Sequence, residues 1–269
     1  MIKCDLHIHT NYSDGALSPG EVMRRLSAMG VQAAAITDHD TIDGIREGRE
    51  AAERYGLKYA DGMEFSTFDE SLGEIHILGY AFDLTDGFIE GLEQAKRLRR
   101  ERIKRMFDNL EREGISFSDE EKDKAKGRVD IAFMLRKAKY VGYINEAFDV
   151  YLGKNGKAYV EAGRLEPSVA VKMIKEAGGV AVLAHPWRFA DEMSLCPLVE
   201  RLKAFGLGGI EVYYPSHTPE MRKELALTAE RYDLIKTGGS DFHMDSSSVR
   251  LGDGNAVLDE RAEKIIFRK

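Results

Sequence analysis

The amino-acid sequence predicts an α/β fold: a mostly parallel sheet, open or closed into a barrel, interrupted by a mostly helical insertion. The first observation is that short apolar runs alternate with amphipathic helical patterns, which is typical of strand–helix–strand units. The second is that this alternation breaks at residues 87–166, where helical patterns follow one another. A chain of 269 residues is long enough for one such domain with an insertion.

Each expected element has its own signal. Ser18 and Pro19 are typical of a helix N-cap and first turn, and several helical stretches end on glycine, a common stop. The insertion begins with a long helical pattern and continues through shorter ones. The expected strands are residues 3–9, 32–37, 57–65, 74–82, 179–185, 208–214 and 234–239. The expected helices are residues 18–30, 47–56, 87–114, 128–142, 167–178 and 196–206.

Composition narrows the class of protein. The net charge of −7 argues against a non-specific grip on duplex DNA, which needs a basic face. No apolar run approaches the roughly 20 residues that a membrane helix needs, and the first residues lack the pattern of a signal peptide. Cys4 and Cys196 form neither a disulfide framework nor a CxxC pair, so a reducing cytoplasm is the expected location.

Polar residues gather at the ends of the expected strands. His7 and His9 lie two apart on one strand, so their side chains project to the same face. The other strands deliver acids or histidines at or near the C-terminal edge, where parallel α/β folds build their sites. These residues are Asp38, His39, Glu64, His76, His185, Glu211, Asp241 and His243. A single histidine there is usually structural, but six of the seven histidines share this placement, which predicts one metal site.

The chemistry of these side chains indicates the kind of metal. Imidazole nitrogen and carboxylate oxygen suit zinc, iron and manganese, and the absence of cysteine from the set argues against a structural zinc site. Six histidines with Asp14, Glu64 and Asp241 exceed what one ion can use, so two or three ions with a bridging carboxylate are expected. Closely spaced ions generate hydroxide at neutral pH and clamp a phosphoryl group.

Seven motifs make the chain resemble the PHP (polymerase and histidinol phosphatase) superfamily, in its branch of stand-alone nucleoside 3′,5′-bisphosphate phosphatases and 5′-to-3′ exoribonucleases. The motifs are DLHIHTNYSDG, AITDHDT, GMEFS, EIHILGY, VAVLAHP, IEVYYPSHT and TGGSDFH. The resemblance implies a distorted (β/α)₇ barrel with metal ions at its C-terminal mouth. We expect the barrel to comprise residues 1–86 and 167–269, with residues 87–166 as a helical insertion over the mouth.

The resemblance also implies a ligand for each ion. It places the first ion on His7, His9, Glu64 and Asp241, which are also the expected catalytic residues. It makes Glu64 a bridge to a second ion held by His76 and His185. It places a third ion on Asp14, His39 and His243. All nine positions carry the residue type that the family uses.

The expected substrate contacts are less specific. His217, in YYPSHT, either stabilises its loop or contacts substrate at the rim of the site. Trp187 is either a buried aromatic residue or a platform on which a base stacks. The family's Arg-x-His-Ile-Ala segment reads GRVDIA here, which keeps Arg128 for a phosphate but puts Asp130 in place of the histidine. Asp130 either faces the substrate or caps a helix, since aspartate is a favoured N-cap.

The resulting hypothesis is a cytoplasmic, monomeric phosphoesterase. We expect it to act through a metal-bridging hydroxide on a nucleoside 3′,5′-bisphosphate or a short 5′-phosphorylated oligonucleotide. The main alternative is a phosphatase for a non-nucleotide monoester such as histidinol phosphate. An amidohydrolase usually has a metal-bridging lysine, which has no match here, and a complete ligand set argues against a non-catalytic metal-binding module. The length excludes a polymerase-attached proofreading domain.

Overall fold

The structure is a computed structural model, and it divides the chain into two compact units. The barrel unit comprises Met1–Leu92 and Leu165–Lys269, and the helical unit comprises Glu93–Arg164. Each unit is described by itself. The described residues are 2–161, 163–188, 192–245, 249–254 and 256–268.

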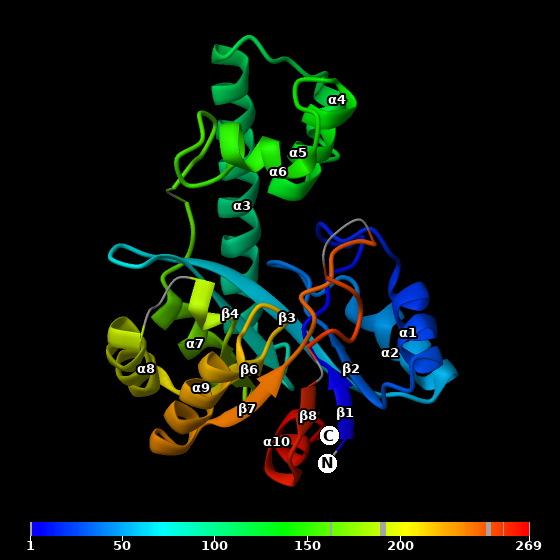
Figure 1. Cartoon of the computed structure of the whole chain (residues 1–269), viewed down its shortest axis with the longest axis vertical. Helices are drawn as coiled ribbons and strands as arrows, with labels where there is room; N and C mark the ends of the chain where they lie inside the picture. The colour runs from blue at the N-terminus through cyan, green and yellow to red at the C-terminus, as the bar shows by residue number, and fades with distance from the viewer. Residues whose placement is uncertain (1, 162, 189–191, 246–248, 255, 269) are drawn as a thin grey trace. The chain divides into compact units, whose positions relative to one another are not determined.

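In the described part of the chain, eight strands form one sheet in the order β7-β6-β5-β4-β3-β2-β1-β8 (Figure 1). Their bounds are β1 Ile2–Asp5, β2 Ala33–Ile36, β3 Lys58–Asp69, β4 Gly73–Tyr80, β5 Val180–Leu183, β6 Leu207–Tyr213, β7 Ile235–Gly238 and β8 Ala256–Leu258. Most neighbours pair in parallel, which confirms the predicted α/β class. Two strands depart from it, because β4 is antiparallel to both of its neighbours and β8 is antiparallel to β1.

The sheet curves so that the chain just beyond β1 lies beside the end of β7. The backbone N–H of Leu6 donates to the carbonyl of Gly238 at 3.2 Å, and the N–H of Asp241 donates to the carbonyl of His7 at 2.8 Å. These bonds join the segment that follows β1 to the last residue of β7 and to the segment after it. The result is a nearly closed barrel, as predicted, in which two segments far apart in sequence run side by side.

Alternate strand residues face the barrel interior and the surrounding helices, because successive side chains on a strand point to opposite faces. Ala33 and Ala35 of β2 join the interior cluster, together with residues of other strands and of the helix α10, Glu260–Ile266. Ala34 and Ile36 instead join a cluster with the helices α1, Pro19–Ala28, and α2, Ile45–Tyr55. Burial on both faces explains why the strands read as continuous apolar runs.

Helices surround the barrel, and four of them occur where the sequence predicts helices, but the helices Pro219–Arg231 and Glu260–Ile266 were not predicted. The side chain of Ser18 accepts the N–H of Glu21 at the start of α1, which confirms the predicted N-cap. Gly56 ends α2 in the left-handed conformation, with φ of 72°. The helices that lie in this unit are α1 Pro19–Ala28, α2 Ile45–Tyr55, α7 Pro167–Glu176, α8 Glu192–Phe205, α9 Pro219–Arg231 and α10 Glu260–Ile266.

The helical unit has its own apolar core. The helix α3, Asp86–Arg112, begins in the barrel unit and continues into this one. The buried side chains of Met106, Leu110, Ile131 and Leu135 belong to one cluster here. The remaining elements are α4 Asp119–Lys122, α5 Arg128–Lys137, α6 Ile144–Ala147 and a π-helical turn at Phe148–Leu152.

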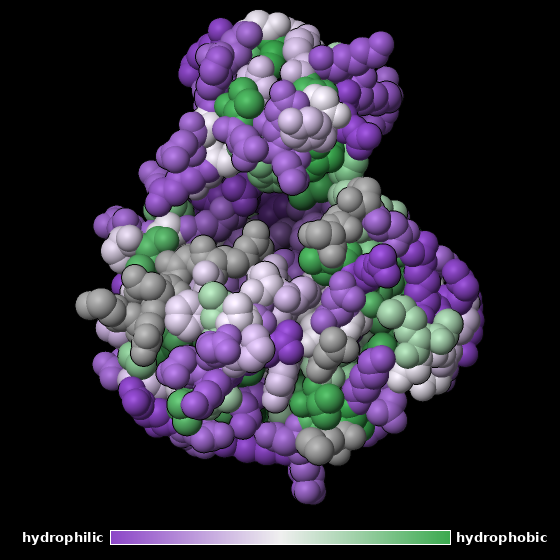
Figure 2. Space-filling model, in the orientation of Figure 1, coloured by the Kyte–Doolittle hydropathy of each residue, from purple (hydrophilic) through white to green (hydrophobic). Residues whose placement is uncertain are grey.

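The surface is largely polar. In Figure 2, hydrophilic residues cover most of the visible face, and hydrophobic residues show as small separate groups. Across the described residues, no helix combines the length and the apolar character needed to cross a membrane.

Candidate metal centre

The opening HIH segment enters the site just beyond β1. The prediction that both histidines lie within a strand was wrong in detail, because β1 ends at Asp5. The chain stays paired with its neighbours beyond that point, and His7 and His9 are completely buried with ring centroids 5.3 Å apart. The loop that follows is held by the buried carboxylate of Asp38, which accepts hydrogen bonds from the backbone N–H and the hydroxyl of Thr10 at 2.7 and 2.6 Å.

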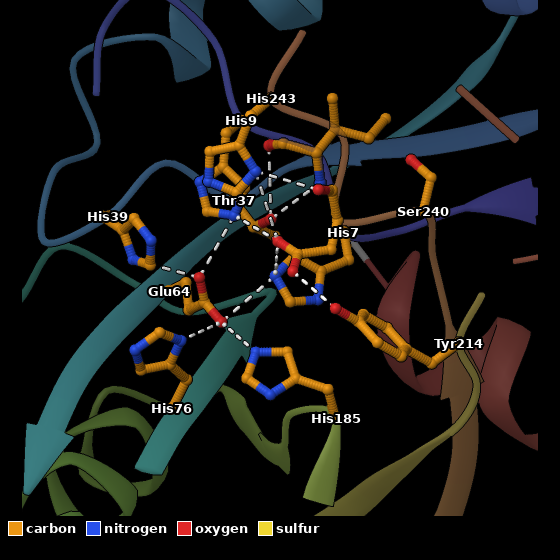
Figure 3. A network of polar contacts seen from close by, with 12 residues as sticks. His7, His9, Thr37, His39, Glu64, His76, His185, Tyr214, Ser240 and His243 are labelled. Atoms are coloured by element: carbon orange, nitrogen blue, oxygen red, sulfur yellow. Dashed lines mark hydrogen bonds and ion pairs between the residues drawn. The ribbon is translucent and has the colours of Figure 1, made fainter. Parts of the chain in front are cut away.

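Glu64 lies at the middle of the cluster, and the labelled histidines of Figure 3 other than His243 turn toward its carboxylate. Its side chain, from β3, is completely buried. One carboxylate oxygen, Oε1, lies 3.2 Å from His7 Nε2, 3.0 Å from His76 Nδ1 and 3.3 Å from His185 Nε2. The other, Oε2, lies 3.2 Å from His9 Nε2 and 3.1 Å from His39 Nδ1. The two oxygens thus face different groups of imidazoles.

The direction of β4 explains how His76 reaches this site. Most ligand candidates come from the carboxyl ends of parallel strands, but His76 lies in the first half of β4. Because β4 runs antiparallel to β3 and β5, its first half lies at the end of the barrel where β3 and β5 have their carboxyl ends. The sequence prediction included His76 among the ligand candidates but did not foresee this reversal of the strand.

Asp241 and His243 enter from the segment after β7. The Asp241 Oδ1 atom lies 3.1 Å from His9 Nε2 and 3.4 Å from His7 Nε2. Asp241 has φ of 53°, a left-handed conformation that is unfavourable for a residue with a Cβ and is typical of functional sites. Tyr214 supports it by donating its hydroxyl hydrogen bond to Asp241 Oδ2 at 2.9 Å.

Among the described residues, three groups have the proximity needed to hold an ion. Within each group the ligand atoms lie within 4.8 Å of one another. The groups are His7, His9, Glu64 and Asp241; His9, Asp14, His39 and His243; and His39, Glu64 and His76. The first equals the set expected for the first ion, and the second adds His9 to the set expected for the third. The last contains Glu64 and His76 but has His39 in place of the expected His185, so the division of ligands among ions stays a prediction.

The side chains present fit divalent transition ions. His7 Nε2, both ring nitrogens of His9 and both carboxylate oxygens of Glu64 are buried, and within the described ranges none has a hydrogen-bond partner in suitable geometry. Buried polar atoms without such a bond are costly, and bonds to a cation would satisfy all of these at once. Nitrogen and oxygen donors of this kind suit zinc, iron and manganese.

The electrostatics of the cluster favour cations. Burial alone lowers the pKa of His7, but the carboxylates of Glu64 and Glu211 outweigh it and hold this pKa well above its usual range. Burial is likewise outweighed at His9, where the carboxylates of Asp241 and Glu64, 3.1 and 3.2 Å from Nε2, raise the pKa to about 10. Burial raises the pKa of Glu64, but His76 and His7 reverse the effect and hold it well below its usual range. Glu64 and Asp241 are therefore ionised, and their negative charge attracts protons or cations to the neighbouring imidazoles.

His217 and Trp187 lie on loops of the barrel unit. The His217 ring is buried, and its Nδ1 donates to the carbonyl of Val212 at 3.0 Å, which stabilises the loop after β6. Its ring centroid lies 5.1 Å from that of Tyr214, which in turn lies 5.4 Å from that of His185. Trp187 is half-buried in the turn Pro186–Arg188 directly after His185. Neither residue belongs to the three ion-holding groups of the described chain.

Arg128 and Asp130 lie in the helical unit. The helix α5 begins at Arg128, so Asp130 is its third residue and not the N-cap. Asp130 nevertheless caps the helix, because its Oδ2 accepts the backbone N–H groups of Lys126 and Gly127 at 2.8 and 3.0 Å. The structure therefore contains the capping contact, at a different position of the helix from the one expected.

Two further residues, Glu211 and Tyr214, contact expected ligands, and the sequence prediction gave neither of them a role. Glu211 stood among the polar residues at strand ends, but a glutamate in an apolar run shows only its position and not its partners. Tyr214 was missed, because a tyrosine at the end of an apolar run is typical of a core residue. For Tyr214 the only available signal was its place at the same strand end as the ligands.

Similarity to known proteins indicates the protein family to which the chain belongs. A model of the PHP domain family matches residues 5–177. The chain is 38% identical over 263 residues to the 5′-3′ exoribonuclease of Haemophilus influenzae, with 96% of each chain covered. It is 34% identical over 263 residues to the 3′,5′-nucleoside bisphosphate phosphatase of Chromobacterium violaceum, with 93% of this chain and 90% of the relative covered. A solved structure from Bifidobacterium adolescentis, described as a metal-dependent phosphoesterase, matches with a TM-score of 0.86 at 29% identity and covers 98% of this chain and 94% of that one.

The fold, the buried imidazole–carboxylate cluster and these similarities define the class as metal-dependent phosphoesterases, which are hydrolases. The chain belongs to the PHP domain family. The resemblance inferred from the motifs is therefore confirmed, as are the barrel fold and the enzyme class. Divalent metal ions are the cofactors that this class and this cluster require.

Proposed function

We propose that this phosphoesterase hydrolyses a phosphate ester of a small nucleotide, either a nucleoside 3′,5′-bisphosphate or a short 5′-phosphorylated oligonucleotide. The observation that carries the proposal is the arrangement around Glu64, whose two buried oxygens face separate groups of imidazoles within 3.3 Å. A site that holds two ions side by side is suited to displacement at phosphorus. The names of the two sequence relatives favour a nucleotide over histidinol phosphate as the substrate class.

The proposed cofactors are two or three divalent ions of manganese, iron or zinc. His7, His9, Glu64 and Asp241 would hold the first, His76 and His185 would share Glu64 with the second, and Asp14, His39 and His243 would hold the third. When bound, such ions activate water at neutral pH and neutralise charge on the phosphoryl group. The individual assignments, like a monomeric state and a cytoplasmic location, stay predictions.

The protein's own part in the reaction is to fix these side chains before substrate arrives. Glu64 is completely buried, so its carboxylate cannot turn toward solvent. Asp241 is fixed through its backbone N–H bond to His7 and the hydroxyl of Tyr214. Preorganised groups of this kind need no rearrangement as charge develops in the transition state. Glu64, His7, His9 and Asp241 are therefore the proposed catalytic residues.

The proposed substrate contacts are Trp187, His217, Arg128 and Asp130. Trp187 follows β5, which leads into the ligand candidate His185, and His217 follows β6, whose Glu211 contacts the ligand candidate His7. Arg128 is proposed from the sequence pattern alone, because a guanidinium can grip a second phosphate through two parallel hydrogen bonds. Asp130 beside it would repel that phosphate, so we propose weaker discrimination for a non-scissile phosphate than is usual in the family.

Phosphate release in the presence of manganese tests the function. The three substrates to compare are a nucleoside 3′,5′-bisphosphate, a 5′-phosphorylated oligoribonucleotide and histidinol phosphate. The proposal requires one of the nucleotide substrates to have the highest kcat/KM and chelation to abolish the activity. A higher kcat/KM for histidinol phosphate would contradict the nucleotide assignment and support the alternative.

A further inference from the structure

A second buried carboxylate lies beside the metal centre and outside its ion-holding groups. Glu211, on β6, is completely buried. Its Oε1 and Oε2 atoms lie 3.1 and 3.3 Å from Nδ1 of His7. Its Oε2 also accepts the backbone N–H of His185 at 2.8 Å. Among the described residues, Glu211 belongs to none of the three candidate ion sites. It instead contacts two expected ligands, His7 and His185.

The contact with His7 determines which ring nitrogen carries a hydrogen. Both carboxylate oxygens of Glu211 face Nδ1 of His7, and Oε2 already accepts the N–H of His185, so the ring nitrogen is the donor in this contact. The other nitrogen, Nε2, faces the cluster, 3.2 Å from Glu64 and 3.4 Å from Asp241. In the neutral ring this tautomer leaves the lone pair on Nε2, and a lone pair is what a metal ligand needs.

The contact with His185 fixes a strained backbone. His185 follows β5 and has φ of 27°, in a region that residues with a Cβ rarely adopt. The carboxylate of Glu211, on the neighbouring strand, holds its N–H. The side chain of Glu211 therefore orients the ring of His7 and holds the backbone of His185.

We infer that Glu211 is a positioning residue, which keeps His7 in the tautomer that exposes Nε2 to a divalent cation and holds His185 in place. The inference rests on the proposed metal centre. Carboxylates that accept the outer N–H of a ligating histidine orient the ring and raise its basicity, and their loss commonly lowers metal affinity about 10- to 100-fold.

The variant Glu211→Gln separates this role from simple filling of space. Glutamine has nearly the same shape, and its carbonyl oxygen can keep the bond from the N–H of His185. Its amide nitrogen then lies where Oε1 was, next to Nδ1 of His7, and two donors face each other. Turning the amide over restores the acceptor for His7 but leaves the N–H of His185 facing a donor. The first orientation leaves Nδ1 of His7 only the longer, 3.3 Å contact with the oxygen beside a facing donor, and the second leaves the N–H of His185 facing a donor, so either one weakens the hold on a ligand.

The first measurement is calorimetric titration of the chelator-treated full chain with Mn²⁺ and with Zn²⁺. We expect Glu211→Gln to bind at least one ion about 10- to 100-fold more weakly than the unmodified chain. Asp69→Asn is the matched control, because Asp69 is also a buried carboxylate with a cationic partner, Arg201, but lies outside the centre. The control should bind both metals with unchanged affinity. Equal affinities for Glu211→Gln and the unmodified chain would overturn the inference.

A second measurement needs no variant to fold. In the Zn²⁺-loaded chain with ¹⁵N-labelled histidine, long-range proton–nitrogen spectra distinguish a protonated ring nitrogen from a metal-bound one. The inference requires His7 to be protonated at Nδ1 and bound through Nε2; binding through Nδ1 would overturn it. Failure of the unmodified chain to bind either metal would instead contradict the proposed function.

Discussion

The carboxylate of Glu64 lies 3.0 Å from Nδ1 of His76, and the two residues come from neighbouring antiparallel strands. Glu64 pairs directly with Leu78, so His76 is its diagonal neighbour on the same face of the sheet. The remaining side-chain contacts of Glu64 come from the segments that follow β1, β2 and β5. One carboxylate thus collects ligands from around the whole barrel mouth.

Replacing this carboxylate should be more damaging than any other single change in the site. Glu64→Gln removes one negative charge and one oxygen acceptor from a position that faces two candidate ion sites. We expect kcat to fall by at least about a thousandfold, measured with manganese in excess. His217→Ala should cost far less, because His217 contacts Val212 and not the cluster. Similar losses for both variants would show that the division between ligands and loop residues is wrong.

Metal binding should release protons. The pKa values of His7, His9 and His76 are raised, because the carboxylates of the cluster outweigh burial at each ring. At His7, whose pKa is held well above its usual range, and at His9, where it is raised to about 10, the rings hold protons at neutral pH in the metal-free protein, and a metal must displace them. Affinity for Mn²⁺ should therefore increase with pH through the histidine range and toward about pH 10, the pKa of His9.

Calorimetry in two buffers of different ionisation enthalpy measures this release. At pH 7 we expect at least one proton to leave for each chain saturated with Mn²⁺. An identical heat of binding in both buffers, after correction for dilution, would contradict the charge state assigned to the imidazoles.

The hydroxyl of Tyr214 should matter through Asp241. Tyr214→Phe removes a hydrogen bond to an ionised carboxylate, and such bonds contribute about 1.5–3 kcal/mol. We expect kcat/KM to fall about tenfold or more, and the thermal unfolding temperature to fall by several degrees because a buried hydrogen bond is lost. Tyr232→Phe is the control, because Tyr232 also donates to a carboxylate, Glu200, but lies on the surface. If the two variants retain the same activity, Tyr214 does not position Asp241.

Asp130 can be tested for substrate contact without losing its cap. Asp130→Asn keeps an oxygen acceptor for the N–H groups of Lys126 and Gly127 but removes the negative charge. If Asp130 faces substrate, the ratio of kcat/KM for a bisphosphate over a monophosphate should rise in this variant and rise further in Asp130→His. Arg128→Ala should raise KM mainly for the bisphosphate. An unchanged ratio in both Asp130 variants would leave capping as the whole role of this residue.

The metal-ligand candidates could be predicted because their signal is local. His7 and His9 are two residues apart and therefore share a face, and most other candidates follow an apolar run directly. The direction of β4 was harder to predict, because the sequence predicts that the preceding strand ends at residue 65. Polar residues follow that position, but β3 continues to Asp69. With only residues 70–72 between β3 and β4, a parallel connection is excluded.

The missing parts of the prediction depend on contacts between distant segments. β8 has three residues, too few for a pattern, and it forms by pairing with β1 from the other end of the chain. Glu211 and Tyr214 contact residues that are up to 204 positions away in sequence. Such partners are set by the closure of the barrel and not by local periodicity.

The central claim is that one barrel mouth holds a multinuclear centre built around Glu64. The most direct measurement is the transition-metal content per chain in the sample with the highest specific activity, after dialysis against metal-free buffer. The account predicts two or three ions per chain, and a lower content together with lost activity in Glu64→Gln. Full activity with no more than one ion per chain would contradict it.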